Sequence, residues 1–236
     1  MRISKDCFLL NIPIAHRGLW NENIVENSLS AYKNAIDNGY GIEIDLYSTK
    51  DNQIVCFHDD TLFRMTKTHG FIYDKTLKEL KQLFLLDSNE KIPTLKEVLS
   101  LVNGKVPLLI EFKDQPDKSY IERAVKILKE YDGDFAVQSF NPLYLLKIKK
   151  LAPNFVIGIL GTHTPPKHKN FIIKKAVKKL SLNFLIKPDF ISYNFQGLPI
   201  KNKHNLPLLA WTITDKLQAE NSLKFADNII FENFLP

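Results

Sequence analysis

The sequence GIEIDLYSTKDNQIVCFHDD, residues 41–60, alternates apolar and polar side chains with a period of two. This alternation is typical of β-strands. The pair Asp51-Asn52 interrupts it and favours a tight turn, so we expect a strand that continues into an antiparallel ribbon ending near His58. Period two also places Glu43 and Asp45 on the same face of the strand.

Strand-like and helix-like segments alternate along the rest of the chain. Apolar runs that we predict as strands lie at residues 12–15, 106–112, 135–140, 156–160, 189–195, 208–214 and 228–232. Together with the strand that starts at residue 41, they make eight β/α units. Apolar strands separated by helices indicate a parallel sheet covered on both faces, and eight such units predict a closed (β/α)8 barrel of the TIM type.

Two parts of the chain depart from a regular barrel. Residues 61–93 show no continuous pattern, and we interpret them as a small insertion after the second strand. The sequence ends at Pro236, shortly after the last predicted strand, so we expect a shortened C-terminal end without the final helix. The length favours a single barrel domain over residues 1–236.

Capping signals mark the starts of several predicted helices. Asn27 can cap a helix, and Asn141-Pro142 combines a cap with a proline at the first helical position. The stretches Thr76-Leu-Lys-Glu79 and Thr94-Leu-Lys-Glu97 are capping boxes, the second of which opens a helix with a buried apolar face.

The composition, 44% hydrophobic and 25% charged over 236 residues, allows a full core, so disorder is not expected. The 2 cysteines lack CxxC spacing, which argues against a disulfide framework or a thiolate zinc site and favours a reducing compartment. No apolar run approaches the roughly 20 residues that cross a bilayer, and the N-terminus lacks the long apolar region of a signal peptide. We therefore expect a cytoplasmic protein without stable membrane association.

The net charge of +6 would suit nucleic acid, a membrane surface or an anionic substrate as a partner. Much of this excess lies in KHKNFIIKKAVKK, residues 167–179. Apolar residues in this stretch have helical spacing, which leaves the lysines on a solvated outer face. Because no aromatic residues are interleaved with these lysines in the manner of a nucleic-acid patch, we expect no nucleic-acid partner.

Carboxylates lie at the ends of two predicted strands. Catalytic groups of TIM-type barrels lie at the C-terminal ends of strands. In this chain the second strand carries Glu43 and Asp45 there, and the third carries Glu111 and Lys113. Three carboxylates without cysteine favour a hard cation, Mg²⁺ or Ca²⁺, with zinc as the weaker alternative. Alternatively, Glu43 and Asp45 could pair with Arg17 and Lys113 in a structural ion network.

Two histidines and two fixed cations flank the same predicted rim. His16 and Arg17 end the first strand, and His58 ends the ribbon. Histidines suit a general acid and a general base, because their ordinary pKa of about 6.5 lets them exchange protons near neutral pH. Arg17 and Lys113 favour a phosphate or phosphodiester substrate, whose transition state gathers negative charge. The residues together predict metal-assisted phosphodiester cleavage.

A series of motifs resembles the glycerophosphodiester phosphodiesterases, in order from residue 14 to about residue 214. The combination of HRG, ExD, HD and ExK elements at these separations is more specific than any one of them. The stretches that carry the resemblance are AHRG (15–18), EN (26–27), GIEIDLYSTKDNQIVCFHDDTLFRMTKTHG (41–70), IPTLKEVL (92–99), LLIEFK (108–113), QSFN (138–141) and AWTIT (210–214).

The resemblance implies a TIM-type barrel with a small insertion that matches residues 61–93. It also implies that Glu43, Asp45 and Glu111 hold one divalent cation, that His16 and His58 act as acid and base, and that Arg17 and Lys113 contact the phosphate. The family's products are an alcohol and glycerol 3-phosphate. A glycerol hydroxyl is thought to attack phosphorus, giving a cyclic phosphate that water then opens.

Phe140 ends the fourth predicted strand, and Trp211 lies within the seventh. Each could pack inside the barrel or form a wall for the glycerol moiety, so we treat both as candidate substrate-binding residues. Within the family's EN element, a helix cap alone would explain Asn27.

The chain departs from the family pattern at three places. Phe231-Glu232 replaces the usual Thr-Asp pair on the last strand, Thr214 stands where Asn is usual, and Val25 stands where Pro is usual. These differences bear on the outer half of the substrate and on the closing of the barrel. An exposed gap beside the first strand could be covered by a second copy of the chain, so a homo-oligomer is one expectation.

Three functional classes fit these residues. The first is a phosphodiesterase that acts on small glycerophosphodiesters. The second uses the same site on a larger diester, either a lysophospholipid in the manner of phospholipase D or a glycerol phosphate unit of a surface polymer. The third, a catalytically silent binding barrel, is disfavoured because both histidines and all three carboxylates are present.

Overall fold

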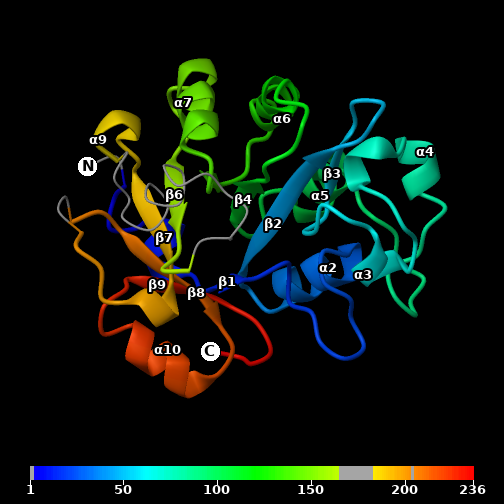
Figure 1. Cartoon of the computed structure of the whole chain (residues 1–236). Coiled ribbons are helices and arrows are strands. Elements are labelled where there is room, and N and C mark those ends of the chain that lie inside the picture. Colours follow the sequence, from blue (N-terminus) through cyan, green and yellow to red (C-terminus); the bar gives the residue numbers. More distant parts are fainter. Residues whose placement is uncertain (1–2, 165–182, 203–204) are drawn as a thin grey trace. The chain divides into compact units, whose positions relative to one another are not determined.

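The computed structural model describes residues 3–164, 183–202 and 205–236 (Figure 1). The chain divides into a first unit, residues 15–135, and a second unit, which combines residues 1–14 with residues 136–236. The expectation of one domain over residues 1–236 stays a prediction. The basic helix predicted at residues 167–179 lies outside the described residues.

The regular elements follow the predicted alternation of strands and helices. The strands are β1 (Ile14–Ala15), β2 (Gly41–Ser48), β3 (Ile54–Cys56), β4 (Leu108–Phe112), β5 (Phe135–Ser139), β6 (Ile157–Gly161), β7 (Phe190–Asn194), β8 (Leu208–Ile213) and β9 (Asn228–Phe231). The α-helices are α1 (Phe8–Asn11), α2 (Leu29–Asp37), α3 (Phe63–Thr66), α4 (Leu77–Leu80), α5 (Leu95–Val102), α6 (Tyr120–Leu128), α7 (Pro142–Leu151), α9 (Asn183–Ile186) and α10 (Lys216–Ser222). The 3₁₀ helices are η1 (Ile72–Asp74) and η2 (Phe195–Gly197).

The strand pairing has the connectivity of a (β/α)8 barrel. The hydrogen-bonded order is β1-β9-β8-β7-β6-β5-β4-β2-β3, and β1 also pairs with β2. In the first unit β2 and β4 are parallel, and in the second unit β5 through β9 are successively parallel. β3 is the exception, because it runs antiparallel to β2 as the predicted ribbon. The predicted fold class is therefore confirmed.

Strand β2 positions the carboxylates of the first unit. All eight of its residues are buried, and its partner on the ribbon is reached through a turn at Asn52, which has a φ of 66°. Asparagine adopts this left-handed backbone conformation more readily than most residues, which explains why Asp51-Asn52 marks the turn. On the other edge of β2, Asp45 is in register with Glu111 of β4. The sheet thus places two acidic side chains beside each other.

Helix starts agree with the predicted caps at three of the four positions. Thr76 and Thr94 each form a complete capping box, and Asn141 accepts a hydrogen bond from the Leu143 backbone N–H with Pro142 at the first position. The prediction for Asn27 is wrong. The cap of α2 is Ser28, whose side chain accepts from the Ala31 N–H.

Replacing Thr94 with Ala should lower the free energy of unfolding by about 1 kcal/mol, because the helix then loses a side chain that accepts from the Glu97 N–H. Ser100→Ala, at an exposed position inside the same helix, is the control and should change stability by less than about 0.5 kcal/mol. Urea unfolding of both purified variants measures the difference. Equal midpoints for the two would contradict the role assigned to the cap.

Residues 61–93 carry α3, η1 and α4 and share an apolar cluster with the β2–β3 ribbon. Met65, Ile72 and Leu80 from this segment pack with Tyr47 and Val55 from the ribbon, and all five are buried. This cluster fixes the segment against the strands that bear the site. The identification of residues 61–93 as an insertion stays a prediction.

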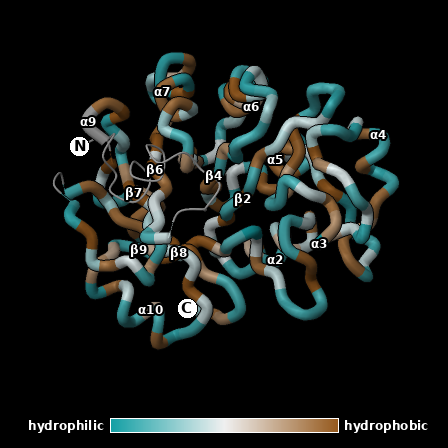
Figure 2. The backbone as a smooth tube through the Cα atoms, viewed as in Figure 1, coloured by the Kyte–Doolittle hydropathy of each residue, from teal (hydrophilic) through white to brown (hydrophobic). Residues whose placement is uncertain are grey.

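Helices α6 and α7 are amphipathic, and each packs its apolar face against the rest of the protein. In Figure 2, α6 and α7 each show hydrophobic and hydrophilic turns next to one another, as amphipathic helices do. The apolar face of α6 is buried through Tyr120, Ile121, Ala124, Val125 and Leu128.

The N-terminal residues add an element that the sequence analysis did not predict. Helix α1 belongs to the second unit, where the Asn228 side-chain amide of β9 donates to the backbone carbonyls of Leu9 and Ile12. This contact ties the start of the chain to its last strand. No helix in the described part of the chain has the length and apolar character needed to cross a membrane.

Candidate active site

Three buried carboxylates of the first unit converge beside one another. Glu43 and Asp45 come from β2 and Glu111 from β4, and the three residues are buried, with exposed fractions of 2%, 0% and 8%. One oxygen of each lies within 4.8 Å of the others. Alternation along β2 explains why Glu43 and Asp45 share a face, and the parallel register brings Glu111 to them. The predicted carboxylate cluster is therefore present.

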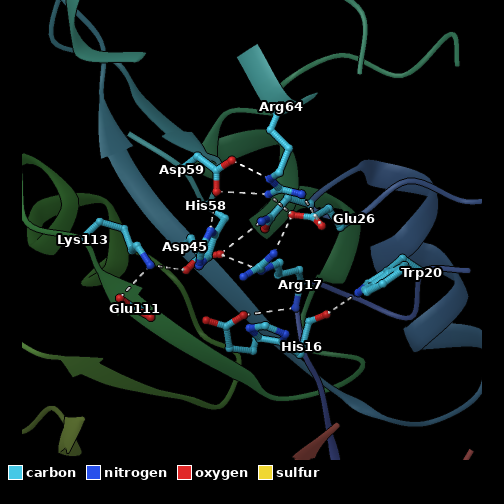
Figure 3. A network of polar contacts seen from close by, with 12 residues as sticks. His16, Arg17, Trp20, Glu26, Asp45, His58, Asp59, Arg64, Glu111 and Lys113 are labelled. Atoms are coloured by element: carbon cyan, nitrogen blue, oxygen red, sulfur yellow. Dashed lines mark hydrogen bonds and ion pairs between the residues drawn. The ribbon is translucent and has the colours of Figure 1, made fainter. Parts of the chain in front are cut away.

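One lysine neutralises part of this cluster. The Lys113 ammonium lies 3.0 Å from a Glu111 oxygen and 3.3 Å from Asp45 Oδ1 (Figure 3). Burial by itself would lower the pKa of Lys113, but the Asp45 and Glu111 carboxylates outweigh it and raise that pKa above its usual range. Burial would raise the pKa of Asp45, but Lys113, His58 and Arg17 hold it well below its usual range. Asp45 thus pairs with Lys113 and, at 3.9 Å, with Arg17 Nε, as the alternative of a structural ion network expected for this residue. Glu111, which that alternative did not include, joins through Lys113.

Glu43 is the carboxylate whose charge is least compensated. It accepts from the Arg17 backbone N–H at 3.1 Å, and within the described residues it forms no ion pair with a side chain. Burial, followed by repulsion from Asp45 and Glu111, raises its pKa well above the usual value. A buried carboxylate in this situation favours either a proton or an additional cation.

The donor set fits a hard divalent cation. All three candidate ligands are carboxylates, which is the oxygen chemistry that Mg²⁺ and Ca²⁺ select. Asp45 Oδ1 is buried and has the Lys113 ammonium nearby, but among the described residues it accepts no hydrogen bond. A buried oxygen with an open lone pair that faces two other carboxylates is suited to metal ligation.

The two predicted catalytic histidines lie near each other in the first unit. His16 follows β1 and His58 follows β3, and their ring centroids are 6.5 Å apart with the planes at 79°. His58 Nδ1 lies 2.7 Å from an oxygen of Asp59. Because a carboxylate accepts, the neutral imidazole carries its proton on Nδ1 and leaves Nε2 to exchange a proton.

Arg17 occupies the same region with an unusual backbone. Its φ is 60°, and the glycine after it has a φ of 82°. A Cβ on Gly18 would lie 2.9 Å from Ala31, so the HRG motif requires glycine at this position. The Arg17 Nη1 donates to Glu26 at 2.8 Å, whereas its Nε is buried and has no hydrogen-bond partner among the described residues. That Nε remains available to an anionic oxygen.

Sequence reasoning missed the role of Asn27. Its side-chain amide donates to Asp45 Oδ2 at 3.1 Å, and its carbonyl oxygen accepts from the Tyr32 hydroxyl at 2.8 Å. Asn27 has a φ of 51°, which is incompatible with starting the helix from that position and turns its side chain toward Asp45 instead. The EN motif was the signal for this contact, but a cap explained the same residue more simply.

Three further residues surround the histidine and arginine. Glu26 accepts from Arg17, Asp59 contacts His58, and Arg64 of α3 donates to both of these carboxylates (Figure 3). Glu26 and Asp59 stood within quoted motifs without an assigned role. Arg64 also lies within a quoted stretch, residues 41–70, but it had no assigned role, and no periodic pattern in residues 61–93 singled it out.

Phe140 and Trp211 belong to the second unit. Their rings form an edge-to-face contact with centroids 5.7 Å apart. The Trp211 Nε1 is buried and lacks a hydrogen-bond partner among the described residues. Their predicted contact with the substrate stays a prediction.

The family model for glycerophosphoryl diester phosphodiesterases matches residues 16–232, which include every candidate residue above. The chain belongs to this family. It is 33% identical to a glycerophosphodiester phosphodiesterase of Caldanaerobacter subterraneus subsp. tengcongensis over 94% of each chain. It is 25% identical to a glycerophosphodiester phosphodiesterase of Bacillus subtilis, over 94% of this chain and 83% of that one.

Solved structures agree with this membership. An Oleispira antarctica phosphodiesterase, determined in complex with the product sn-glycerol-3-phosphate, superposes with a TM-score of 0.80 at 26% identity. That similarity covers 94% of this chain and 93% of the other chain. The family resemblance stated from the motifs is therefore confirmed, together with the barrel fold.

Proposed function

We propose that the chain hydrolyses small glycerophosphodiesters to an alcohol and glycerol 3-phosphate with the help of one Mg²⁺ or Ca²⁺ ion. The observation that carries this proposal is the cluster of Glu43, Asp45 and Glu111 beside two histidines within one unit. Membership of the phosphodiesterase family and the product bound to the Oleispira antarctica relative support the substrate class.

Glu43, Asp45 and Glu111 would hold the cation. When bound, it would lower the pKa of a coordinated hydroxyl and offset negative charge on the phosphate. Arg17 Nε, which lies 3.9 Å from Asp45 Oδ2 and has no hydrogen-bond partner among the described residues, would donate to a phosphate oxygen. Lys113 would supply a second positive charge, since its contacts with Asp45 and Glu111 keep it protonated.

The two histidines would move the protons. One imidazole would accept the proton of the attacking glycerol hydroxyl, and the other would donate a proton to the leaving alkoxide. Because their ring centroids are only 6.5 Å apart, both imidazoles could reach one phosphodiester group bound beside them. Asp59 would keep His58 in the tautomer that exposes Nε2.

Release of glycerol 3-phosphate, read with a coupled dehydrogenase, tests the proposal with the small diesters and the polymer. With a lysophospholipid, the released headgroup alcohol is measured, because the other product is then lysophosphatidate. The panel consists of glycerophosphocholine, glycerophosphoethanolamine and glycerophosphoglycerol, together with a lysophospholipid and a glycerol phosphate polymer. Turnover of the three small diesters is expected. Turnover of the lysophospholipid or the polymer alone would replace the proposal with one of the larger-substrate alternatives, and no turnover with either cation would refute it.

Metal removal should abolish this activity. With excess chelator we expect no release of glycerol 3-phosphate above background, because the buried carboxylates then repel one another and no divalent cation neutralises the phosphate. Adding Mg²⁺ or Ca²⁺ beyond the chelator should restore the rate, and titrating each cation identifies the preferred one. Full activity in chelator would exclude a metal.

A further inference from the structure

The Arg64 guanidinium bridges two carboxylates of the first unit. Its Nε and Nη2 donate to the two oxygens of Asp59 at 2.6 and 3.1 Å. Its Nη1 and Nη2 donate to the two oxygens of Glu26 at 2.9 and 2.7 Å. The planar fork of arginine matches a carboxylate along each of two edges, which is why one side chain can hold both (Figure 3).

Each of these carboxylates also holds a candidate site residue. Asp59 lies 2.7 Å from His58 Nδ1, and Glu26 accepts from Arg17 Nη1 at 2.8 Å. The result is a continuous chain of contacts in the order His58, Asp59, Arg64, Glu26 and Arg17. Arg64 is thus linked to His58 through Asp59 and to Arg17 through Glu26.

The balance of charge shows what Arg64 contributes. Burial would raise the pKa of Glu26, but hydrogen bonds and charge from Arg64 and Arg17 keep it below its usual value. Without Arg64, Glu26 and Asp59 would lose the one side chain in the described part of the chain that forms ion pairs with both of them. The Arg64 side chain itself is 45% exposed, so its ion pairs contribute little to folding stability. Arg64 should therefore act mainly by fixing the positions of the Glu26 and Asp59 carboxylates.

We propose that Arg64 is a positioning residue of the phosphodiesterase site, holding Asp59 against His58 and Glu26 against Arg17. It also anchors the site to residues 61–93, because α3 carries it. This inference rests on the proposed function. It extends that function by assigning a task to a segment that contains none of the predicted catalytic or metal-binding residues.

The test compares Arg64→Gln and Arg64→Lys with Lys78→Gln. Lys78 lies on α4 of the same segment and is exposed, so its substitution removes the same charge from a solvated position. We expect Arg64→Gln to lower kcat/KM by about 10- to 100-fold, as is common for residues that orient catalytic groups. Arg64→Lys should recover only part of this loss, since an ammonium cannot bind both carboxylates in two-point fashion. Lys78→Gln should match the wild type.

Two comparisons separate positioning from a merely structural role. Asp59→Asn should mainly lower kcat, Glu26→Gln should mainly raise KM, and Arg64→Gln should change both. The effects of Arg64→Gln and Asp59→Asn should also fail to add in the double variant, because the two residues act through one contact. Thermal melting should show Arg64→Gln folded with a midpoint close to that of the wild type.

A spectroscopic readout makes the outcome independent of activity. The imidazole ¹⁵N shifts of metal-free protein, with His58 assigned by its absence in His58→Asn, report which ring nitrogen carries the proton. We expect a proton on Nδ1 in the wild type and in Lys78→Gln, and a mixture of tautomers in Arg64→Gln. Wild-type kinetics and an unchanged His58 spectrum in Arg64→Gln would overturn the inference. An inactive wild type would refute the proposed function, and the spectrum would still decide the role of Arg64.

Discussion

His58→Ala is expected to lower kcat by at least about 100-fold with the fold intact, and His16→Ala should do the same. Both rings lie in the same region as the carboxylate cluster of the first unit, and neither belongs to the buried apolar core. Loss of the His58 imidazole also leaves the Asp59 carboxylate bound to Arg64, so no buried charge is orphaned. The large effect should therefore fall on the proton transfer and leave stability nearly unchanged.

His69→Ala provides the matched control for these two variants. His69 lies in the same unit, and its ring stacks on Phe63 with centroids 4.7 Å apart. Its removal deletes an imidazole from the surface of residues 61–93 and should leave kcat within about twofold of the wild type. Glycerol 3-phosphate release measured at saturating cation and substrate compares the three variants. Near-normal hydrolysis by purified His16→Ala or His58→Ala would remove the acid–base assignment.

Local pattern was sufficient for the strand that carries the site. Alternation over residues 41–48 predicted β2, and the turn residues Asp51-Asn52 predicted the ribbon that leads to His58. The same alternation put Glu43 and Asp45 on one face, and the β/α rhythm implied that Glu111 would come from a neighbouring parallel strand. These features depend on the periodicity of the backbone, so they can be predicted from the sequence alone.

Long-range polar contacts were beyond the reach of such patterns. Asn27 looks like a cap, because asparagine is among the favoured residues at that position, but Ser28 next to it serves equally well. The buried Asp45 needs a donor, and satisfying it takes Asn27 away from the helix. Arg64 sits on a helix of 4 residues with no periodic signal, and its partners are 38 and 5 positions away. Only the folded chain shows that these residues meet.

Glu43→Gln should abolish metal-dependent activity and yet stabilise the metal-free protein at neutral pH. The variant removes a carboxylate ligand while keeping an oxygen that can accept from the Arg17 N–H. In the metal-free wild type, burial and the neighbouring Asp45 and Glu111 raise the pKa of Glu43 above its ordinary value of 4.5. The folded state then binds more protons than the unfolded state, so this group lowers stability increasingly as the pH rises above about 4.5. Glutamine has no charge to desolvate and avoids that cost.

Thermal unfolding in chelator is followed across pH and then repeated with Mg²⁺ or Ca²⁺. Together these measurements test the expected gain in stability of the metal-free variant and its expected loss of stabilisation by the cation. The advantage of Glu43→Gln over the wild type should vanish near pH 4.5 and grow toward neutrality. Added cation should stabilise the wild type, by about 2.7 kcal/mol at 100 times the dissociation constant, and should leave the variant nearly unchanged. Glu130→Gln removes the same charge from an exposed position and should show neither effect. If Glu43→Gln is less stable than the wild type in chelator at neutral pH, the charge of Glu43 is compensated in the metal-free protein. If the cation stabilises the variant as much as the wild type, Glu43 is not a metal ligand.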